Sequence, residues 1–287
     1  MNKLLALASL LLCLSCKRQA DFDQEVTALA KGKDLKVGVA LIDLKTGEIK
    51  QVNGDDPFPL QSVFKFHIAA KALEQVDKGK WQLRDQISIE PGEIYTDLYS
   101  PIRDEIGTNL SSMRLDSLIY YMVSLSDNSA CDILLRHLGG PSTVNEYIKE
   151  IGIKNTKIEV NELTMQSRWE EQYRNISTPL SVAETLKKFY LREYLSGDMH
   201  DFLWALMENS PTGANRIRKG LPEGAVLAHK TGTSGRNVDG ISGATNDAGI
   251  IILPDGRAYV LVVFVSDSKE SDEVNEELIA KIAELIP

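Results

Sequence analysis

The sequence predicts an α/β (α+β) fold in which N- and C-terminal helices flank an antiparallel sheet of about five strands and an all-helical subdomain is inserted. Three observations carry this prediction. Segments with strand-like alternation lie near both chain ends, at 35–54 and 225–268. The segment 59–205 between them has helical periodicity. Residues 253–258, LPDGRA, form a hairpin signal between two long β-rich runs, so antiparallel neighbours are expected there.

The elements follow in order along the chain. Residues 21–32 form an amphipathic pattern that predicts a helix ending at Gly32, and 35–44 and 48–54 alternate as two strands joined by a turn. Helices are expected next at 62–79, 113–126, 128–140, 141–152, 179–194 and 198–209. Strands at 225–235, 246–256 and 257–268 and a helix at 272–286 complete the chain.

This order predicts one domain over 21–287. An α/β subdomain would be formed by 21–58 and 206–287, and a helical subdomain by 59–205. A cleft between two such units is the expected place for a small-molecule site.

Residues 1–20 are expected to be a signal peptide and not part of the fold. The stretch MNKLLALASLLLCLSC has one lysine, an apolar run and then small residues, and it is too short to span a bilayer comfortably. Lipidation at Cys16 and plain cleavage near 18–20 both stay open. In either case the mature chain is expected to be exported, to the periplasm or to a membrane surface through a lipid anchor, without a transmembrane segment.

Composition and the cysteine and histidine content exclude several classes of function. The net charge is −9 and there is no basic cluster, which argues against a nucleic-acid partner. Only Cys131 remains beyond the signal, so no intramolecular disulfide can form, and it is expected to be a core residue. The histidines lack the spacing of zinc ligands, so no metal or other cofactor is expected: His67, His137, His200 and His229. A monomer is the default expectation.

Ser62 and Lys65 lie one turn apart where a proline-containing loop gives way to the apolar helix 62–79. A serine at a helix start has free backbone N–H donors beside it, and an amine one turn away can take its proton. A capping serine followed by a surface lysine is the ordinary alternative. The same spacing recurs at 266–269 in a polar stretch, so spacing alone does not decide.

Two further triplets carry polar groups suited to a cleft. Ser126-Asp127-Asn128 stands between two expected helices, and Lys230-Thr231-Gly232 lies on an expected strand. A turn and a simple strand edge explain each triplet taken alone. Together and in this order, Ser-x-x-Lys, Ser-Asp-Asn and Lys-Thr-Gly resemble the penicillin-recognising serine enzymes, which include class A β-lactamases and penicillin-binding proteins. The resemblance covers nearly the whole mature chain.

This resemblance implies a role for each motif residue. Ser62 would be acylated, Lys65 would assist proton transfer, and Ser126 would protonate the leaving nitrogen. The residues implied to bind substrate are Asn128 at the acyl amide, Lys230 and Thr231 at the carboxylate, and Thr233, whose N–H with that of Ser62 would form the oxyanion hole.

A deacylating carboxylate would make the protein a β-lactamase rather than a transpeptidase. Glu162 fits that place, with Gln166 where most class A members have Asn, a layout that is similar to the PER-like branch. Glu170 and Glu171 are rivals nearer the end of the loop. Asp132 also replaces a typical Asn, and it would brace the loop that carries Glu162.

Two more positions agree with the resemblance. Tyr99 in YSP matches an aromatic wall at the cleft mouth, although a turn tyrosine is an alternative, and Arg216 matches an arginine that helps bind the carboxylate, with Arg218 as the alternative. The expected protein is therefore a class A serine β-lactamase that hydrolyses penicillins or cephalosporins and confers resistance. The alternatives are a D-Ala-D-Ala peptidase or penicillin-binding protein, and a non-catalytic exported binding protein.

Overall fold

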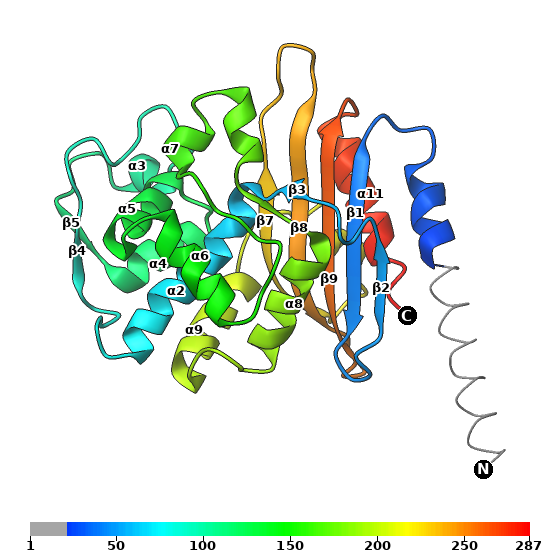
Figure 1. Cartoon of the computed structure of the whole chain (residues 1–287), viewed down its shortest axis with the longest axis horizontal. Helices are drawn as coiled ribbons and strands as arrows, with labels where there is room; N and C mark the ends of the chain where they lie inside the picture. The colour runs from blue at the N-terminus through cyan, green and yellow to red at the C-terminus, as the bar shows by residue number, and fades with distance from the viewer. Residues whose placement is uncertain (1–21) are drawn as a thin grey trace.

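The computed structural model describes residues 22–287, and a five-stranded antiparallel sheet lies at its centre (Figure 1). The strand order is β2-β1-β9-β8-β7. The bounds are β1 Lys36–Asp43, β2 Ile49–Val52, β7 Val226–Thr233, β8 Ser242–Ile252 and β9 Ala258–Ser268. The first strand thus pairs with the last, and the predicted fold class is confirmed. The expected signal peptide and Cys16 lie outside the described residues.

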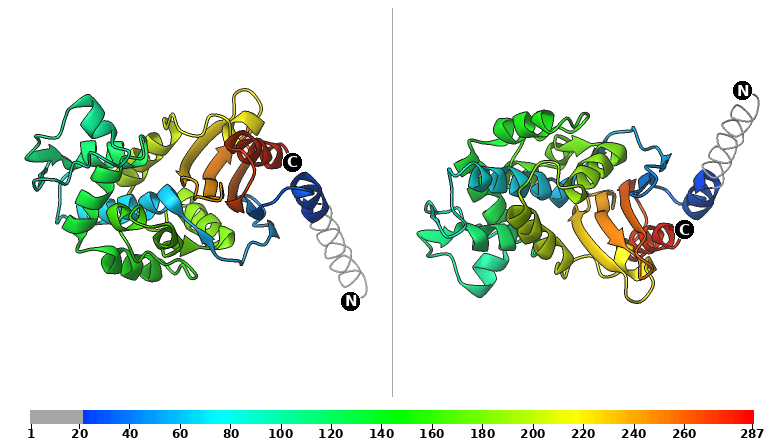
Figure 2. Two further views of the ribbon diagram at one scale, coloured as in Figure 1. Left: turned by 90° about the horizontal axis from the view of Figure 1, so that it is seen from above. Right: turned by 90° about the horizontal axis from the view of Figure 1, so that it is seen from below.

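Side chains of the sheet alternate between two hydrophobic cores, as the period of two in a strand requires. On β1, Val39 and Leu41 face a core that includes the helix at residues 22–30 and α11 (Asp272–Ala283), whereas Ala40 and Ile42 face the helical side. Figure 2 shows the two terminal helices on the same side of the sheet. Both chain ends therefore contribute to one core, as the sequence predicts.

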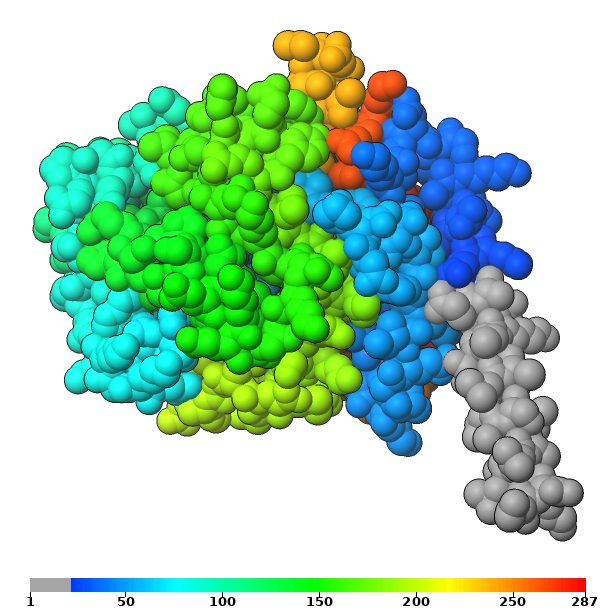
Figure 3. All heavy atoms as spheres, viewed as in Figure 1, coloured from blue at the N-terminus to red at the C-terminus, as the bar shows by residue number. Residues whose placement is uncertain are grey.

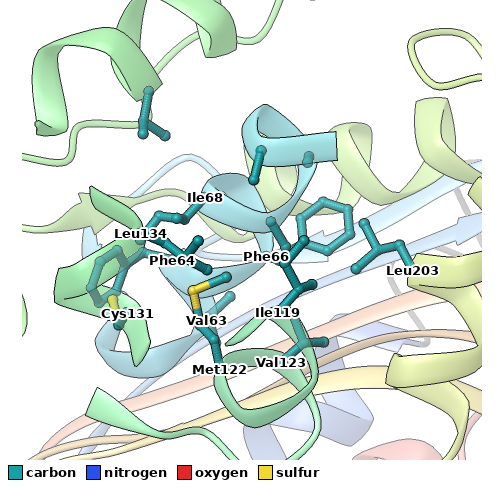
Figure 4. Close-up of a cluster of buried hydrophobic side chains, with 14 of the residues drawn as sticks. Val63, Phe64, Phe66, Ile68, Ile119, Met122, Val123, Cys131, Leu134 and Leu203 are labelled. Atoms are coloured by element: carbon teal, nitrogen blue, oxygen red, sulfur yellow. The ribbon is translucent and has the colours of Figure 1, made fainter. Parts of the chain in front are cut away.

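The helical side is built around α2 (Lys65–Asp77), which contacts α4 (Leu115–Val123), α5 (Asn128–Leu138), α6 (Pro141–Glu150) and α9 (Gly197–Glu208). Figure 4 shows part of this core, where side chains from η1, α2, α4 and α5 meet, including Cys131. The remaining elements are α3 Pro101–Glu105, α7 Glu162–Met165, α8 Pro179–Tyr190, α10 Ile217–Gly220, and the 3₁₀ helices η1 Gln61–Phe64 and η2 Trp169–Tyr173.

The segment 59–205 is not purely helical. Two short ladders occur there, in which β3 (Phe58–Pro59) pairs with β6 (Ile176–Ser177) and β4 (Gln86–Ser88) with β5 (Ser112–Arg114). Strands this short show no alternation, so the pattern did not reveal them. Helix α8 also comes from this segment, yet it packs on β1, β8 and β9. The division into subdomains stays a prediction.

Within 22–287, no helix is long and apolar enough to cross a membrane.

His67 on α2 gives the fold a specific sensitivity to acid. Complete burial lowers the pKa of His67 from its usual 6.5 to about 4. Between these pH values the unfolded chain binds a proton at His67 and the folded chain does not, so the folded state loses stability as pH falls. The loss should reach about 3 kcal/mol by pH 4. Urea unfolding at several pH values should show it, and His67→Phe should weaken the pH dependence. An equal pH dependence in both proteins would contradict this assignment.

Candidate active site

Ser62 lies in the 3₁₀ helix η1, not in the first turn of the α-helix as predicted, because α2 begins only at Lys65. The chain enters this turn through Gln61, whose φ of 45° is in the left-handed region. Side chains three residues apart eclipse one another in a 3₁₀ turn. Lys65 is therefore held over Ser62, with Nζ 3.1 Å from Oγ.

Lys65 is the centre of a buried polar network. Its Nζ donates to Asn128 Oδ1 at 2.6 Å and to the carbonyl oxygen of Ser126 at 2.7 Å, and it lies 2.9 Å from Glu162 Oε1. The side chains of Lys65 and Glu162 are both at most 1% exposed. Among these neighbours only the Ser62 hydroxyl can also donate a proton, since the other three oxygens belong to carbonyl, amide and carboxylate groups. The geometry therefore suits a proton path from Ser62 to Lys65.

Glu162 is the first residue of α7 and belongs to a loop over residues 157–176, here called the Glu162 loop, whose ends join in a bridge between Lys157 and Ile176. Asp132 on α5 holds this loop. Its carboxylate accepts the backbone N–H of Glu162 at 2.7 Å and that of Leu163 at 2.9 Å. Burial and the charge of Glu162 raise the pKa of Asp132 to about 6. These bonds confirm that Asp132 braces the loop.

Replacing Asp132 with alanine should loosen the Glu162 loop. Two backbone donors and the hydroxyl of Tyr95, which donates to Asp132 at 2.8 Å, would lose their acceptor. An unsatisfied buried donor costs about 1–3 kcal/mol. We expect a lower melting temperature and slower release of any acyl-enzyme, measured by calorimetry and stopped flow. Asp132→Asn keeps one acceptor and should fall between the two proteins; an alanine variant indistinguishable from the parent would refute the bracing role.

The rival carboxylates lie elsewhere in the loop. Glu171 pairs with Arg168 and, at 2.7 Å, with Arg174, while Glu170 is exposed on η2. Among these three candidate glutamates, Glu162 is the one that contacts Lys65, so it belongs to the polar network of the site.

The opposite wall of the site comes from β7. Lys230 Nζ donates to Ser126 Oγ at 2.9 Å, and Thr231 Oγ1 donates to Thr212 Oγ1 at 2.8 Å. Because Ser126 accepts from Lys230, its own hydroxyl proton is free to point into the cleft. Ser126 itself has a left-handed φ of 61°, a strained conformation that occurs typically at functional positions.

Gly232 allows β7 to approach η1 closely. A Cβ at this position would lie 2.7 Å from the carbonyl oxygen of Leu60 and 3.2 Å from the backbone nitrogen of Ser62. A larger residue would push the strand away. The approach brings the backbone of Thr233 beside the Ser62 turn, which is the arrangement that two convergent N–H donors need.

Arg216 reaches the same wall from the segment before α10. Its guanidinium donates to Thr233 Oγ1 at 2.7 Å and pairs with Glu276 Oε1 at 3.1 Å. Arg218 instead points to the carbonyl oxygens of Glu208 and Leu227, at 3.4 Å each, and does not line the cleft. Arg216 is therefore the arginine of the site.

A cleft of about 520 Å³ joins these groups. It is lined by predicted residues from both sides: Ser62, Tyr99, Ser126, Asn128, Gln166, Arg216, Thr231 and Thr233. Lys65, Lys230 and Glu162 are buried beneath it. Tyr99 is 58% exposed at its edge. The β7–β8 hairpin, which bears the exposed Val238, projects from the molecule (orange in Figure 3).

The cleft also contains residues that sequence reasoning missed. Asp97, Leu98 and Thr212 line it, and none of them belongs to a recognisable motif. Gln61 stands behind it, and its amide donates to Gln172 Oε1 at 2.9 Å, which ties the Ser62 turn to the Glu162 loop. Only the position of Gln61 directly before Ser62 could have pointed to it.

The electrostatics of Lys230 suit an anionic ligand. Burial and the nearby cations Lys65 and Arg216 lower the pKa of Lys230 well below its usual value, and Glu162 and Asp247 oppose this shift. A bound carboxylate would add a negative charge beside Lys230 and so favour its protonated form.

Comparisons with known proteins agree with one another. A family model described as "Beta-lactamase enzyme family" matches residues 21–287. The extended-spectrum β-lactamase PER-1 of Pseudomonas aeruginosa is 40% identical over 261 residues, which are 91% of this chain and 84% of that one. A β-lactamase structure from Chitinophaga pinensis has a TM-score of 0.88 at 42% identity, covering 92% of this chain and 97% of that one. The structure of the extended-spectrum β-lactamase TLA-1 has a TM-score of 0.90 at 37% identity, covering 92% of this chain and 96% of that one.

Proposed function

The chain belongs to the class A serine β-lactamases, in the PER-like branch, and from that premise we propose what each residue of the cleft does in hydrolysis of the β-lactam amide. The enzyme is a serine hydrolase, so the reaction divides into acylation of a serine and hydrolysis of the resulting ester.

In acylation, Ser62 Oγ attacks the lactam carbonyl carbon and its proton passes to Lys65 Nζ, 3.1 Å away, which must be in its neutral amine form to accept it. The developing oxyanion is held by the N–H groups of Ser62 and Thr233. The C–N bond then breaks, the nitrogen takes the proton of Ser126, and Ser126 regains a proton from Lys65, so the proton given up by Ser62 ends in effect on the leaving nitrogen. The bond from Lys230 to Ser126 Oγ supports this step because it leaves the hydroxyl proton of Ser126 available.

In deacylation, Glu162 takes a proton from a water that attacks the ester carbonyl, and that proton is returned to Ser62 Oγ as the ester bond breaks. The observation that carries this proposal is the position of Glu162, fully buried and 2.9 Å from Lys65, on a loop that Asp132 fixes. A penicillin-binding protein would lack such a base. Gln166, one turn further on, lines the cleft where it can help to orient that water.

Substrate recognition is assigned to the remaining residues of the cleft. Asn128 binds the amide of the acyl side chain, and Lys230, Thr231 and Arg216 bind the carboxylate. Tyr99 packs against the substrate at the cleft mouth. Because PER-1 and TLA-1 are named extended-spectrum enzymes, we expect cephalosporins to be good substrates.

The decisive experiment mixes the mature protein with a chromogenic cephalosporin and follows colour and protein mass together. Sustained turnover supports the proposal. A single burst that leaves a stable adduct on Ser62 would mean a penicillin-binding protein, and neither colour nor adduct would mean a protein that only binds.

We also propose that the mature protein is an exported monomer, in the periplasm or held at a membrane by a lipid on Cys16. The signal-like residues 1–20 support export. Cell fractionation and mass spectrometry of the mature N-terminus test this and distinguish lipidation from plain cleavage.

A further inference from the structure

Besides Lys65 and Glu162, a second pair of buried acidic and basic side chains lies near the cleft: His229 on β7 and Asp247 on β8. Asp247 lies near Lys230, on the side of the cleft where Arg216 also lies. Neither side chain is exposed, and His229 Nδ1 lies 2.8 Å from Asp247 Oδ1. The two strands place Thr231 opposite Asp247 and His229 opposite Gly249, so the imidazole reaches its partner diagonally. A Cβ on Gly249 would lie 2.7 Å from that of His229, so the glycine makes room for the pair.

A buried carboxylate needs polar partners on both oxygens. The second partner of Asp247 is the backbone N–H of Ile217, which donates to Oδ2 at 3.2 Å. Ile217 directly follows Arg216 in the chain. Asp247 therefore fixes the backbone at the point where the Arg216 side chain departs toward the cleft.

The guanidinium of Arg216 rests on the same two strands. It donates to the carbonyl oxygen of Asn246 at 2.9 Å and to that of Gly232 at 3.2 Å. Asn246 directly precedes Asp247. Displacing Asp247 would thus disturb both the backbone of Arg216 and the strand on which its guanidinium lies.

We propose that Asp247, held by His229, is a positioning residue that fixes Arg216 for recognition of the substrate carboxylate. This inference rests on the carboxylate-binding role proposed above for Arg216. Asp247 acts through Arg216 and does not touch the substrate.

A double-mutant cycle tests the inference. Steady-state kinetics with a cephalosporin that carries its ring carboxylate are measured for the parent, Arg216→Ala, Asp247→Asn and the double variant. Asp247→Asn should raise KM about tenfold with little change in kcat, and in the Arg216→Ala background it should have almost no further effect. Asp255→Asn, on the exposed β8–β9 hairpin, is a matched control that should change neither value.

The pH dependence of kcat/KM is a second measurement, because a purely structural effect of Asp247→Asn would leave it unchanged. The charged groups facing Lys230 are Lys65 from α2, Glu162 from its loop, Arg216 and Asp247. Without the charge of Asp247 the pKa of Lys230 falls further, so the alkaline limb of kcat/KM should move to lower pH in Asp247→Asn.

Two substitutions of His229 keep the test decisive if Asp247→Asn folds poorly. The amide of His229→Asn can still donate to Asp247 and should keep KM within about threefold of the parent, whereas His229→Leu should resemble Asp247→Asn. Equal KM values in these two variants, or independent effects in the cycle, would overturn the inference. If Arg216→Ala itself leaves KM unchanged, the carboxylate-binding role of Arg216 fails instead.

Discussion

Glu162→Gln is expected to accumulate an acyl-enzyme on Ser62 and to stall turnover. The amide preserves the size of the side chain but cannot take a proton from water, and general-base assistance contributes about 10²–10⁴-fold to a rate. The ester should therefore form and persist. Stopped flow with a chromogenic cephalosporin should show a burst of one equivalent followed by a steady rate lower by this factor, and intact-protein mass should show the adduct.

Glu171→Gln is the matched control, because Glu171 lies in the same loop but is paired with Arg168 and Arg174. It should turn over like the parent. Undiminished turnover in Glu162→Gln would refute the assigned base. Loss of the burst itself would show that Glu162 is needed before the ester forms, through its contact with Lys65.

Ser62→Ala should abolish both the burst and the adduct. With no nucleophile, kcat should fall on the order of 10⁶-fold, as when a protease triad loses its serine. The cleft otherwise stays intact, so non-covalent binding of the β-lactam should remain measurable by calorimetry. Residual turnover above about 10⁻³ of the parent rate would mean that another group attacks the lactam.

Ser129→Ala is a suitable control for this loss, since Ser129 is buried on α5 and its Oγ accepts the backbone N–H of Tyr95 at 2.9 Å. It should form the adduct at the rate of the parent. A non-catalytic binding protein would behave differently, because Ser62→Ala and its parent would then bind β-lactams alike and neither would gain mass.

The sequence predicted those parts of the fold that depend on local pattern. The β8–β9 hairpin followed from its turn residues, and β1 followed from an apolar, β-rich run, which fits a strand buried on both faces. The ladder of β3 and β6 could not be predicted, since a two-residue strand has no period. The 3₁₀ turn at Ser62 was also missed because it depends on the left-handed backbone of Gln61, where Asn or Gly would have been the usual signal.

The same distinction applies to the site. The resemblance that the three motifs carry predicted one cleft for Ser62, Ser126 and Lys230; in the structure Ser62 and Ser126 line the cleft and Lys230 donates to Ser126. Residue pairs that meet only through tertiary packing could not be predicted from the sequence. Gln61 and Gln172 are 111 residues apart, and His229 meets Asp247 only once the register of β7 against β8 is known.

The pairing of β1 with β9 governs the order in which the chain can fold. Lys36 on β1 bonds to Asp267, 231 residues later, so the first strand is synthesised long before its central neighbour exists. Contacts this far apart carry a large loop-closure cost and slow folding. The helices around α2 depend on nearer contacts and can assemble earlier. The pairing of β1 with β9 is therefore expected to form late, and a chain shortened before β9 would leave β1 with an open edge that favours aggregation.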